Sequence, residues 1–269
     1  MTTDTMKDVT IVGGGIGGLT LALFLHEQGI SCRVYEAVPK IGTVGAGINI
    51  LPHAVKELAS LGLLDALDAV GIRTKDASYF NQYGQHIYTE KAGIDAGYAW
   101  PQFSIHRGDL HQVLLTAAIE RLGEENIVTG HRCTGIEQDQ DTVTTHFVDG
   151  DGDALPSVTS RICVGADGIK SKLREQFYPD EGEPVYAGLT IWRGVLPWKP
   201  FLSGANTIRA GWMPVGKIMV YPIRDNIDDE GNQLMNWVVT QERPRPKVLD
   251  WNKPASIDDF FEPFKNWSF

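Results

Sequence analysis

The chain has 269 residues, a formal net charge of −10, 42% apolar residues and 22% charged residues. This length and composition are typical of a globular protein that buries a substantial core in one or two domains. The acidic balance argues against nucleic acid and against an anionic membrane as the main partner. The three cysteines, Cys32, Cys133 and Cys163, have no zinc-site or CxxC spacing. We therefore expect them to be small core residues in a reducing cytoplasm.

No pattern in the sequence predicts a targeting segment, a membrane span or a metal site. Residues 1–8 are polar and lack the apolar region of a signal peptide. No run approaches the ~18 consecutive apolar residues that indicate a membrane-spanning helix. The acidic, glycine-rich residues 149–153 lack the EF-hand spacing, so we interpret them as a hairpin tip. We expect a cytoplasmic chain without a bound metal.

A glycine-rich turn organises the N-terminal part of the chain. An apolar run, residues 9–12, precedes six residues of which five are glycine, and a second strand-like run ends on Glu36. Between them the pattern predicts a helix over residues 16–28 that stops at Gly29. This order matches the dinucleotide-binding fingerprint, in which a pyrophosphate rests on the N-terminus of a helix.

The residues of this fingerprint have separate physical roles. Gly13 allows a tight turn out of the strand, and Gly15 lets backbone N–H groups approach a phosphate closely. Gly18 lets the helix lie close to the strand. Glu36 lies 23 residues after Gly13, near the ~20-residue offset at which an acidic side chain meets ribose hydroxyls. We therefore predict a nucleotide site here.

The middle of the chain contains two further candidate ligand contacts. Gly45 and Gly47 lie among apolar residues just before a helix predicted to begin at Pro52. They indicate either backbone that passes close to a flat ligand or a glycine bulge in a core strand. We expect Asp109 to cap a helix that runs to residue 122, which places Arg107 at its entrance. There the guanidinium can reach a phosphate or form a local salt bridge.

A second acidic turn follows a β-rich region. Residues 77–90 predict a hairpin, and residues 127–128, 133–136, 143–148 and 158–164 predict three or four strands. The last of these leads into the turn at Asp167 and Gly168, after which Ser171 can open a helix. An acidic residue that follows a strand and precedes a glycine lies where ligands bind in open α/β sheets.

Strand patterns replace helix patterns after Pro184. They cover residues 189–196, 207–213, 218–223 and 234–240, followed by an irregular connector at 243–254 and the start of a helix at 258–267. We therefore predict an α/β fold with two domains. The first is an incomplete Rossmann-like domain over residues 1–183, and the second is a truncated, sheet-rich substrate domain over residues 184–269.

These motifs, in this order, resemble those of the class A flavin-dependent monooxygenases, the para-hydroxybenzoate hydroxylase-like flavoproteins. The glycine turn with Glu36, the helix entrance at Arg107 and the run at residues 165–168 carry the resemblance. Residues 45–50, 100–108 and 189–195 resemble in particular the members that act on phenazine acids.

The resemblance implies FAD as the cofactor, NAD(P)H as a transiently bound cosubstrate, and O₂ and a small aromatic or heteroaromatic molecule as substrates. It implies that NAD(P)H reduces the flavin and that one oxygen atom of O₂ is transferred to the aromatic ring, while the other leaves as water. It assigns no acid–base residue to the protein and leaves the oligomeric state open.

The resemblance also assigns residues to the site. Gly47 and Ile48 would lie near the flavin ring, and the backbone near Cys133 would border the adenine. Trp192 and Tyr221 are candidate substrate residues, although simple sheet packing also explains them. The full set of implied cofactor-binding residues is Gly13, Gly15, Ile16, Gly18, Glu36, Ala37, Gly47, Ile48, Arg107, Cys133, Asp167 and Gly168.

One motif of the family has no counterpart in the sequence. It is a Gly-Asp pair followed by Ala-Ala-His and a proline, and residues 192–269 contain no such run. We therefore expect that the C-terminal part of the fold is missing, that a sheet edge is unpaired and that the chain binds FAD poorly. A non-oxygenating flavin oxidoreductase and a non-catalytic nucleotide-binding fragment are the alternative interpretations.

Overall fold

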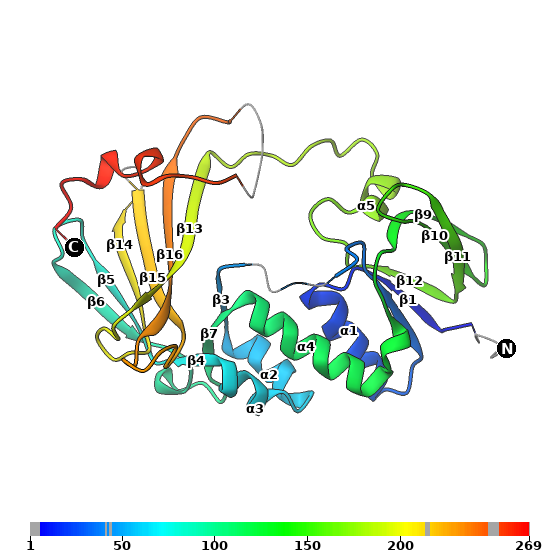
Figure 1. Ribbon diagram of the computed structural model, residues 1–269, viewed down its shortest axis with the longest axis horizontal. Helices are drawn as coiled ribbons and strands as arrows, with labels where there is room; N and C mark the ends of the chain where they lie inside the picture. The colour runs from blue at the N-terminus through cyan, green and yellow to red at the C-terminus, as the bar shows by residue number, and fades with distance from the viewer. Residues whose placement is uncertain (1–5, 41, 43–44, 213–215, 247–252, 269) are drawn as a thin grey trace. The chain divides into compact units, whose positions relative to one another are not determined.

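The computed structural model describes residues 6–40, 42, 45–212, 216–246 and 253–268, and it divides into two compact units (Figure 1). The first unit contains Met1–Thr43 and Leu110–Glu183, and the second contains Val44–Asp109 and Pro184–Phe269. Residues 44–109, which the sequence analysis assigns to the first domain, belong to the second unit. The reason is a long-range strand pairing, described below, that no local pattern shows.

The first unit is built on a four-stranded parallel sheet with the order β12-β1-β2-β8. Its centre, β1, is buried along its whole length, because strands covered on both faces are continuously apolar. Helix α1 follows the glycine turn and ends before Gly29, whose φ of 70° suits the predicted C′ position. The elements are β1 (Val9–Val12), α1 (Ile16–Glu27), β2 (Cys32–Tyr35), β8 (Ile127–Val128) and β12 (Ile162–Gly165).

A three-stranded antiparallel sheet, β11-β10-β9, completes the first unit together with α5. The single strand predicted over residues 158–164 is wrong, because the chain leaves one sheet after Ser160 and enters the other at Ile162. One apolar cluster joins the two sheets: Val12, Tyr35, Cys133, Ile136, Val143, Phe147 and Leu173. The elements are β9 (Arg132–Gln138), β10 (Val143–Val148), β11 (Ala154–Ser160) and α5 (Lys172–Phe177).

The second unit is built on a six-stranded sheet with the order β13-β16-β15-β14-β5-β6. Strands β5 and β6 form the predicted hairpin, and β5 pairs in parallel with β14. This pairing brings the segment at residues 44–109 into the second unit. The strands are β5 (Asp76–Phe80), β6 (His86–Lys91), β13 (Leu189–Trp198), β14 (Asn206–Trp212), β15 (Gly216–Arg224) and β16 (Gln233–Glu242).

A smaller antiparallel sheet, β3-β7-β4, and two helices also belong to the second unit. Helix α2 begins at Pro52, as predicted, because proline has no N–H to lose at the first helical position. The elements are β3 (Gly47–Ile50), α2 (Pro52–Ser60), α3 (Leu64–Val70), β4 (Gly71–Thr74), η1 (Gly93–Ala96) and β7 (Gln102–His106). Helix α4 (Arg107–Leu122) begins in the second unit, but its residues from Leu110 onward and the turn η2 (Glu124–Asn126) belong to the first unit.

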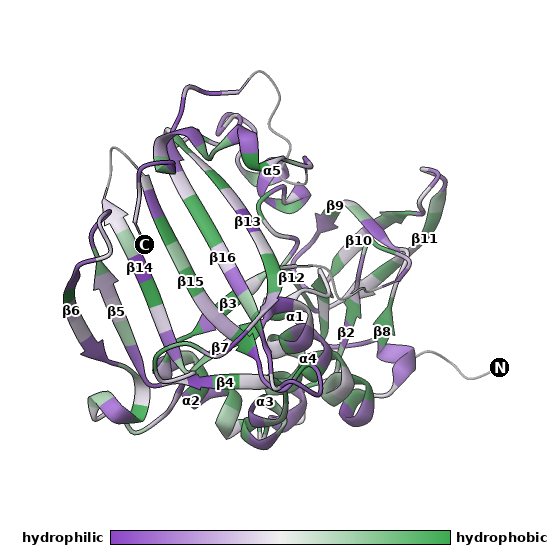
Figure 2. Cartoon of the chain, turned by 60° about the vertical axis from the view of Figure 1, so that its left-hand side comes forward, coloured by the Kyte–Doolittle hydropathy of each residue, from purple (hydrophilic) through white to green (hydrophobic). Residues whose placement is uncertain are grey.

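The six-stranded sheet has two chemically different faces, and Figure 2 shows the alternation of polar and apolar residues along its strands. Residues directly opposite each other on neighbouring strands share a face. Trp192 is opposite Val239, and Val239 is opposite Ile218, which defines the Trp192 face. Tyr221 is opposite Asn236, which defines the Tyr221 face.

The predicted C-terminal helix is wrong. Two short 3₁₀ turns, η3 (Ile257–Asp259) and η4 (Glu262–Phe264), lie where a helix was expected from residue 258. Pro263 lies in the second turn, and proline in the interior of an α-helix removes a backbone hydrogen bond and clashes with the preceding turn. Among the described residues, no helix is long and apolar enough to cross a membrane.

Phe147 lies in the core of the first unit, so its truncation should destabilise the fold. Phe147 is 2% exposed and its ring stacks on that of Tyr35, with 4.6 Å between centroids. Phe147→Ala is expected to lower the free energy of unfolding by about 3–5 kcal/mol, because it removes a buried ring and leaves a cavity. Phe177→Ala is the matched control: Phe177 is 53% exposed, so its truncation should cost under about 1 kcal/mol. Urea unfolding followed by circular dichroism measures both, and equal losses would contradict the described core.

Candidate functional site

The glycine turn of the first unit is held by direct backbone contacts. Gly13 has a φ of 110°, and a Cβ there would lie 2.4 Å from the carbonyl oxygen of Ala166. A Cβ at Gly18 would lie 1.9 Å from the carbonyl oxygen of Gly13. Neither position tolerates a side chain, because real Cβ atoms do not approach backbone so closely. These contacts match the predicted roles of the two glycines.

Helix α1 presents an open N-terminus at this turn. Its N-cap is Gly15, and no side chain of the described residues caps it. A Cβ at Gly15 would meet no described atom within 4 Å, and the first turn, which begins at Ile16, carries no acidic residue. The free N–H groups and the positive end of the helix dipole therefore face open space, an arrangement that binds phosphate oxygens.

Glu36 lies at the end of β2 beside the glycine turn. Its two carboxylate oxygens accept hydrogen bonds from the backbone N–H groups of Gly14, at 2.8 Å, and Val38, at 3.0 Å. Each carboxylate oxygen has a second lone pair, so the group is oriented and still able to accept from ribose hydroxyls. Ala37 lies in the loop between these residues, which is held by a hydrogen bond from the His131 N–H to the Glu36 carbonyl.

Asp167 carries an unsatisfied acceptor beside the same turn. Its Oδ2 accepts a hydrogen bond from the Lys172 N–H at 2.8 Å, whereas Oδ1 is buried and has no partner among the described residues. A buried acceptor without a donor costs free energy, so it indicates a missing hydroxyl or N–H partner. Gly168 follows with a φ of 78°, and Ser171 caps α5 as predicted.

His111 belongs to this site although the sequence analysis did not assign it there. Its Nε2 lies 2.6 Å from the carbonyl oxygen of Gly14, so α4 is tied directly to the glycine turn. The two residues are 97 positions apart, and no local periodicity reports a contact of that range. The one signal in the sequence was that His111 lies in the first turns of the helix that begins at Arg107.

Cys133, assigned to the adenine end, has its side chain in the core of the first unit. Burial raises the pKa of its thiol to about 11. A thiol with that pKa is protonated at neutral pH and packs as a small apolar group. All three cysteines are free, as expected. No group of three His, Cys, Asp or Glu side chains in the described part of the chain could hold a metal ion.

The second unit brings the other predicted cofactor residues close to Tyr221. The Gly47 N–H donates to Asn236 Oδ1 at 2.7 Å, and a Cβ at Gly47 would lie 2.7 Å from the Tyr221 ring. Strand β3, which includes Ile48, therefore packs against the Tyr221 face. The Arg107 N–H donates to the carbonyl of residue 46 at 3.0 Å. These contacts place Gly47 close to both Arg107 and Tyr221.

The predicted capping role of Asp109 is wrong. Helix α4 begins at Arg107, so Asp109 lies within its first turn rather than before it. Its carboxylate instead accepts hydrogen bonds from Nε and Nη2 of Arg224. Arg107 nevertheless lies at the helix entrance, as predicted. No local sequence pattern indicates this ion pair, because its partners are 115 positions apart.

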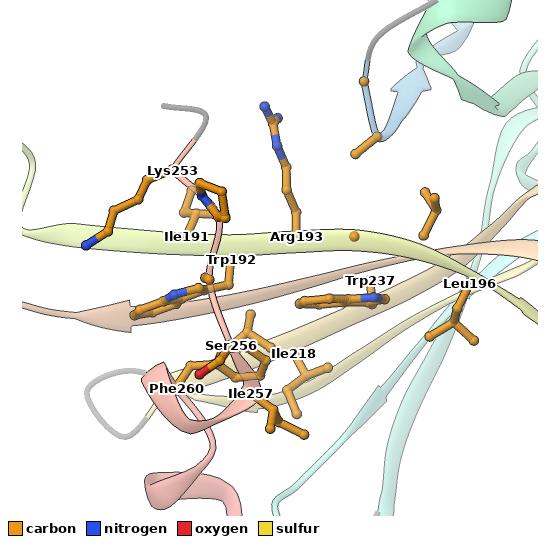
Figure 3. A pocket seen from close by; sticks show the side chains of 17 residues that line it. Ile191, Trp192, Arg193, Leu196, Ile218, Trp237, Lys253, Ser256, Ile257 and Phe260 are labelled. Carbon is orange, nitrogen blue, oxygen red and sulfur yellow. The ribbon is translucent and has the colours of Figure 1, made fainter. Parts of the chain in front are cut away.

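The two predicted substrate residues lie on opposite faces of the sheet. The Trp192 ring lies 5.7 Å from that of Phe260, and the Arg243 guanidinium lies 5.7 Å from the Trp192 ring. Tyr221 is buried on the other face, and burial raises the pKa of its hydroxyl to about 12. In Figure 3 the side chain of Arg193 extends from β13 on the side opposite Trp192.

A hollow of about 790 Å³ is lined by residues of the edge strand β13 and of neighbouring segments. Its aromatic wall on the Trp192 face consists of Trp192, Trp237 and Phe260. Arg193 lines it on the other face, and Gly45 is a further lining residue. Gly194 allows this arrangement, because a Cβ there would lie 2.7 Å from the Trp237 ring.

Comparison with known sequences decides the family. The family described as FAD binding domain matches residues 6–199. The chain belongs to this FAD-binding domain family. The match confirms the recognised family, the α/β fold class with a Rossmann-like FAD-binding domain, and FAD as the cofactor.

Relatives of this chain include several aromatic hydroxylases. Phenazine 1,6-dicarboxylic acid hydroxylase PhzS from Lysobacter antibioticus is 37% identical over 276 residues, which cover 100% of this chain and 67% of that protein. The 3-amino-4-hydroxybenzoate 2-monooxygenase of Streptomyces cremeus is 33% identical and is covered over 53% of its length. The chain therefore spans between about half and two thirds of these relatives.

A solved structure shows the same fold with its cofactor in place. Klebsiella pneumoniae HpxO complexed with FAD and uric acid matches with a TM-score of 0.76 and 25% identity. The match covers 96% of the present chain and 62% of HpxO.

The surroundings of Gly17 and Gly18 predict that alanine lowers the stability of the protein at Gly18 but not at Gly17. Gly18→Ala is expected to lower the free energy of unfolding by about 2 kcal/mol or more, because its Cβ would collide with backbone. Gly17→Ala should be neutral or stabilising, since a Cβ there meets no described atom within 4 Å and alanine favours the helix by about 1 kcal/mol. Thermal unfolding of the FAD-free chain measures both. Equal melting temperatures for the two variants would contradict the described turn.

Proposed function

We propose that this chain acts as an FAD-dependent monooxygenase that uses NAD(P)H and O₂ to hydroxylate a small aromatic or heteroaromatic molecule. The observation that carries the proposal is the convergence of three acceptor and donor groups on one turn. They are the uncapped N-terminus of α1, the oriented carboxylate of Glu36 and the unpartnered Oδ1 of Asp167.

The residues of the first unit fit the ADP half of FAD. The backbone at Gly13, Gly15, Ile16 and Gly18 would hold the pyrophosphate, because open N–H groups and a helix dipole favour anions. Glu36 and Ala37 would border the adenosine ribose, and the backbone near Cys133 the adenine. Asp167 and Gly168 would supply the remaining contacts, with Asp167 Oδ1 accepting a hydroxyl or N–H hydrogen.

In the second unit we assign Gly47, Ile48 and Arg107 to the cofactor and Tyr221 to the substrate. The absence of a side chain at Gly47 supports this assignment, because it leaves a flat strand beside the Tyr221 ring. Tyr221 stays protonated at neutral pH and can donate a hydrogen bond to a substrate oxygen. Trp192 does not join this site, because it lies on the opposite face of the sheet.

When bound, FAD supplies the chemistry of hydride acceptance and oxygen transfer. The contribution of the protein is to orient the reactants on a rigid sheet and to keep water from them. The names of the relatives support aromatic substrates such as phenazine and benzoate acids. The net charge of −10 supports the absence of a nucleic-acid partner, and the three free thiols support a cytoplasmic location.

A non-catalytic nucleotide-binding chain is the second candidate function. The observation that favours it is the coverage of the relatives, of which the chain spans 53% to 67% in the two named above. Both candidates bind FAD, and turnover separates them. A non-oxygenating flavin oxidoreductase is separated from the hydroxylase by the origin of the oxygen atom in the product.

The cofactor assignment predicts losses of FAD affinity for two carboxylate variants. Asp167→Asn and Glu36→Gln should each weaken FAD binding about tenfold or more, because a hydrogen bond to a charged acceptor contributes about 1.5–3 kcal/mol. Titration of FAD fluorescence measures the dissociation constant, and thermal unfolding without FAD confirms that the variants fold.

Asp151→Asn provides the matched control for these two variants. Asp151 lies at the exposed hairpin tip, so its replacement removes the same charge without touching the glycine turn. If all three variants bind FAD with the affinity of the original chain, the assigned site is wrong.

Isotope labelling tests the reaction itself. With FAD, NAD(P)H, ¹⁸O₂ and an aromatic acid such as phenazine-1,6-dicarboxylate, we expect one ¹⁸O atom in the hydroxylated product, detected by mass spectrometry. Oxidation of NAD(P)H with an unlabelled product would support the non-oxygenating oxidoreductase instead. FAD binding without any oxidation of NAD(P)H would support the non-catalytic chain.

A further inference from the structure

We propose that the Tyr221 face selects flat aromatic compounds that carry an acidic group at each end, and that Arg193 and Arg209 hold the two groups. This inference rests on the proposed function, because it names the substrate class of the same site. The row of side chains across the sheet carries it.

Four residues form one row across four neighbouring strands. Arg193 on β13 is opposite Val238 on β16, Val238 is opposite Met219 on β15, and Met219 is opposite Arg209 on β14. Directly opposite residues share a face, and this row is next to the pair formed by Asn236 and Tyr221 on the same face. Neighbouring strands lie about 4.8 Å apart, so the Cα atoms of the two arginines are separated by three spacings, roughly 14 Å.

The floor between the arginines is apolar and partly open. Val238 and Met219 are both half-buried, so each keeps some surface for a ligand. A methionine thioether is polarizable and makes favourable contacts with aromatic rings. A flat ring system can cover these two side chains, whereas a bulky aliphatic group would fit the pleated surface less closely.

Arg193 provides a free cation at one end of the row. It is exposed and lines the hollow at β13 (Figure 3). In the described parts of the chain, no carboxylate lies within ion-pair distance of it. Its positive charge also acts on the Tyr221 face. It lowers the pKa of the Tyr221 hydroxyl, although the larger effect of burial raises that pKa.

Arg209 provides a cation at the other end, held in place by its neighbours. Its Nη1 donates to the Tyr79 hydroxyl at 2.7 Å, and the guanidinium lies 5.3 Å from the centre of the Tyr79 ring. Tyr79 in turn donates to Glu90 at 2.6 Å. A guanidinium has five N–H donors, so one bond to Tyr79 leaves donors for a carboxylate. The group is oriented before any ligand binds, which lowers the entropy cost of pairing.

Two separated cations with an apolar floor between them favour a particular ligand. A monoanion can pair with one guanidinium and leaves the other without a partner. A rigid dianion pairs with both and loses little conformational freedom, whereas a flexible dianion must be ordered first. The expected preference is therefore for a planar fused-ring dicarboxylate over the matched monocarboxylate.

Binding of three matched probes tests the inference on the whole chain, with and without FAD. The probes are naphthalene-2,6-dicarboxylate, 2-naphthoate and naphthalene, and equilibrium dialysis measures their dissociation constants. The dicarboxylate should bind about tenfold more tightly than the monocarboxylate, because one added charge-assisted pair is worth about 1.5 kcal/mol. Raising the salt concentration should narrow this difference.

Substitution of each arginine tests its role. Arg193→Gln and Arg209→Gln should each weaken binding of the dicarboxylate about tenfold and abolish its advantage over the monocarboxylate. The lysine variants of both positions keep the charge and should retain part of the advantage. Arg132→Gln is the control, since Arg132 is exposed on β9 in the first unit, and its replacement should leave all three affinities unchanged.

The outcomes separate this inference from the proposed function. If the dicarboxylate binds no more tightly than 2-naphthoate, or if Arg132→Gln has the same effect as the other two glutamine variants, the inference is overturned. Those results leave FAD binding and ¹⁸O incorporation as independent tests of the monooxygenase. Conversely, a chain that does not bind FAD but shows the expected order of probe affinities overturns the proposed function alone.

Discussion

The contact between Gly13, Gly18 and Ala166 is the constraint on which the first unit depends. It brings the end of β1, the start of α1 and the turn after β12 within van der Waals distance of one another, and each contact is made by backbone. Because no side chain intervenes at Gly13, the Asp167 backbone lies next to the turn that leads into α1, and Glu36 accepts a hydrogen bond from the N–H of Gly14 in that turn. A single added methyl group would move these groups apart, so the glycines preserve the geometry of the site more than its chemistry.

Local patterns were enough to predict the elements whose contacts are local. The strand, turn, helix and terminal Glu36 follow from hydrophobic periodicity and glycine positions within one short stretch. Contacts over long sequence separation were not predictable in the same way. The parallel pairing of β5 with β14 moved residues 44–109 into the second unit, and Arg224 drew Asp109 away from a capping role. Both depend on which distant segments meet.

Trp192 and Tyr221 lie on opposite faces of the sheet for a different physical reason. In a strand, successive side chains point to opposite faces, so whether two residues of different strands share a face depends on the register of every strand between them. A shift of one position in the pairing of β13 with β16 alone would have placed them on the same face. The sequence indicated two aromatic residues in strands, and only the observed register shows that one packs beneath the C-terminal segment and the other beside Gly47.

The acidic net charge does not oppose the anionic ligands argued for both units, because ligand contacts are local. At physiological ionic strength the Debye length is about 8 Å, so exposed carboxylates elsewhere on the chain act weakly at the site. The first turn of α1 contains no acidic residue, and the row from Arg193 to Arg209 presents two cations across an apolar floor. An extended polyanion such as nucleic acid must cover a wide surface and meets the net charge of −10. A pyrophosphate or a small dicarboxylate meets only the few groups placed to receive it.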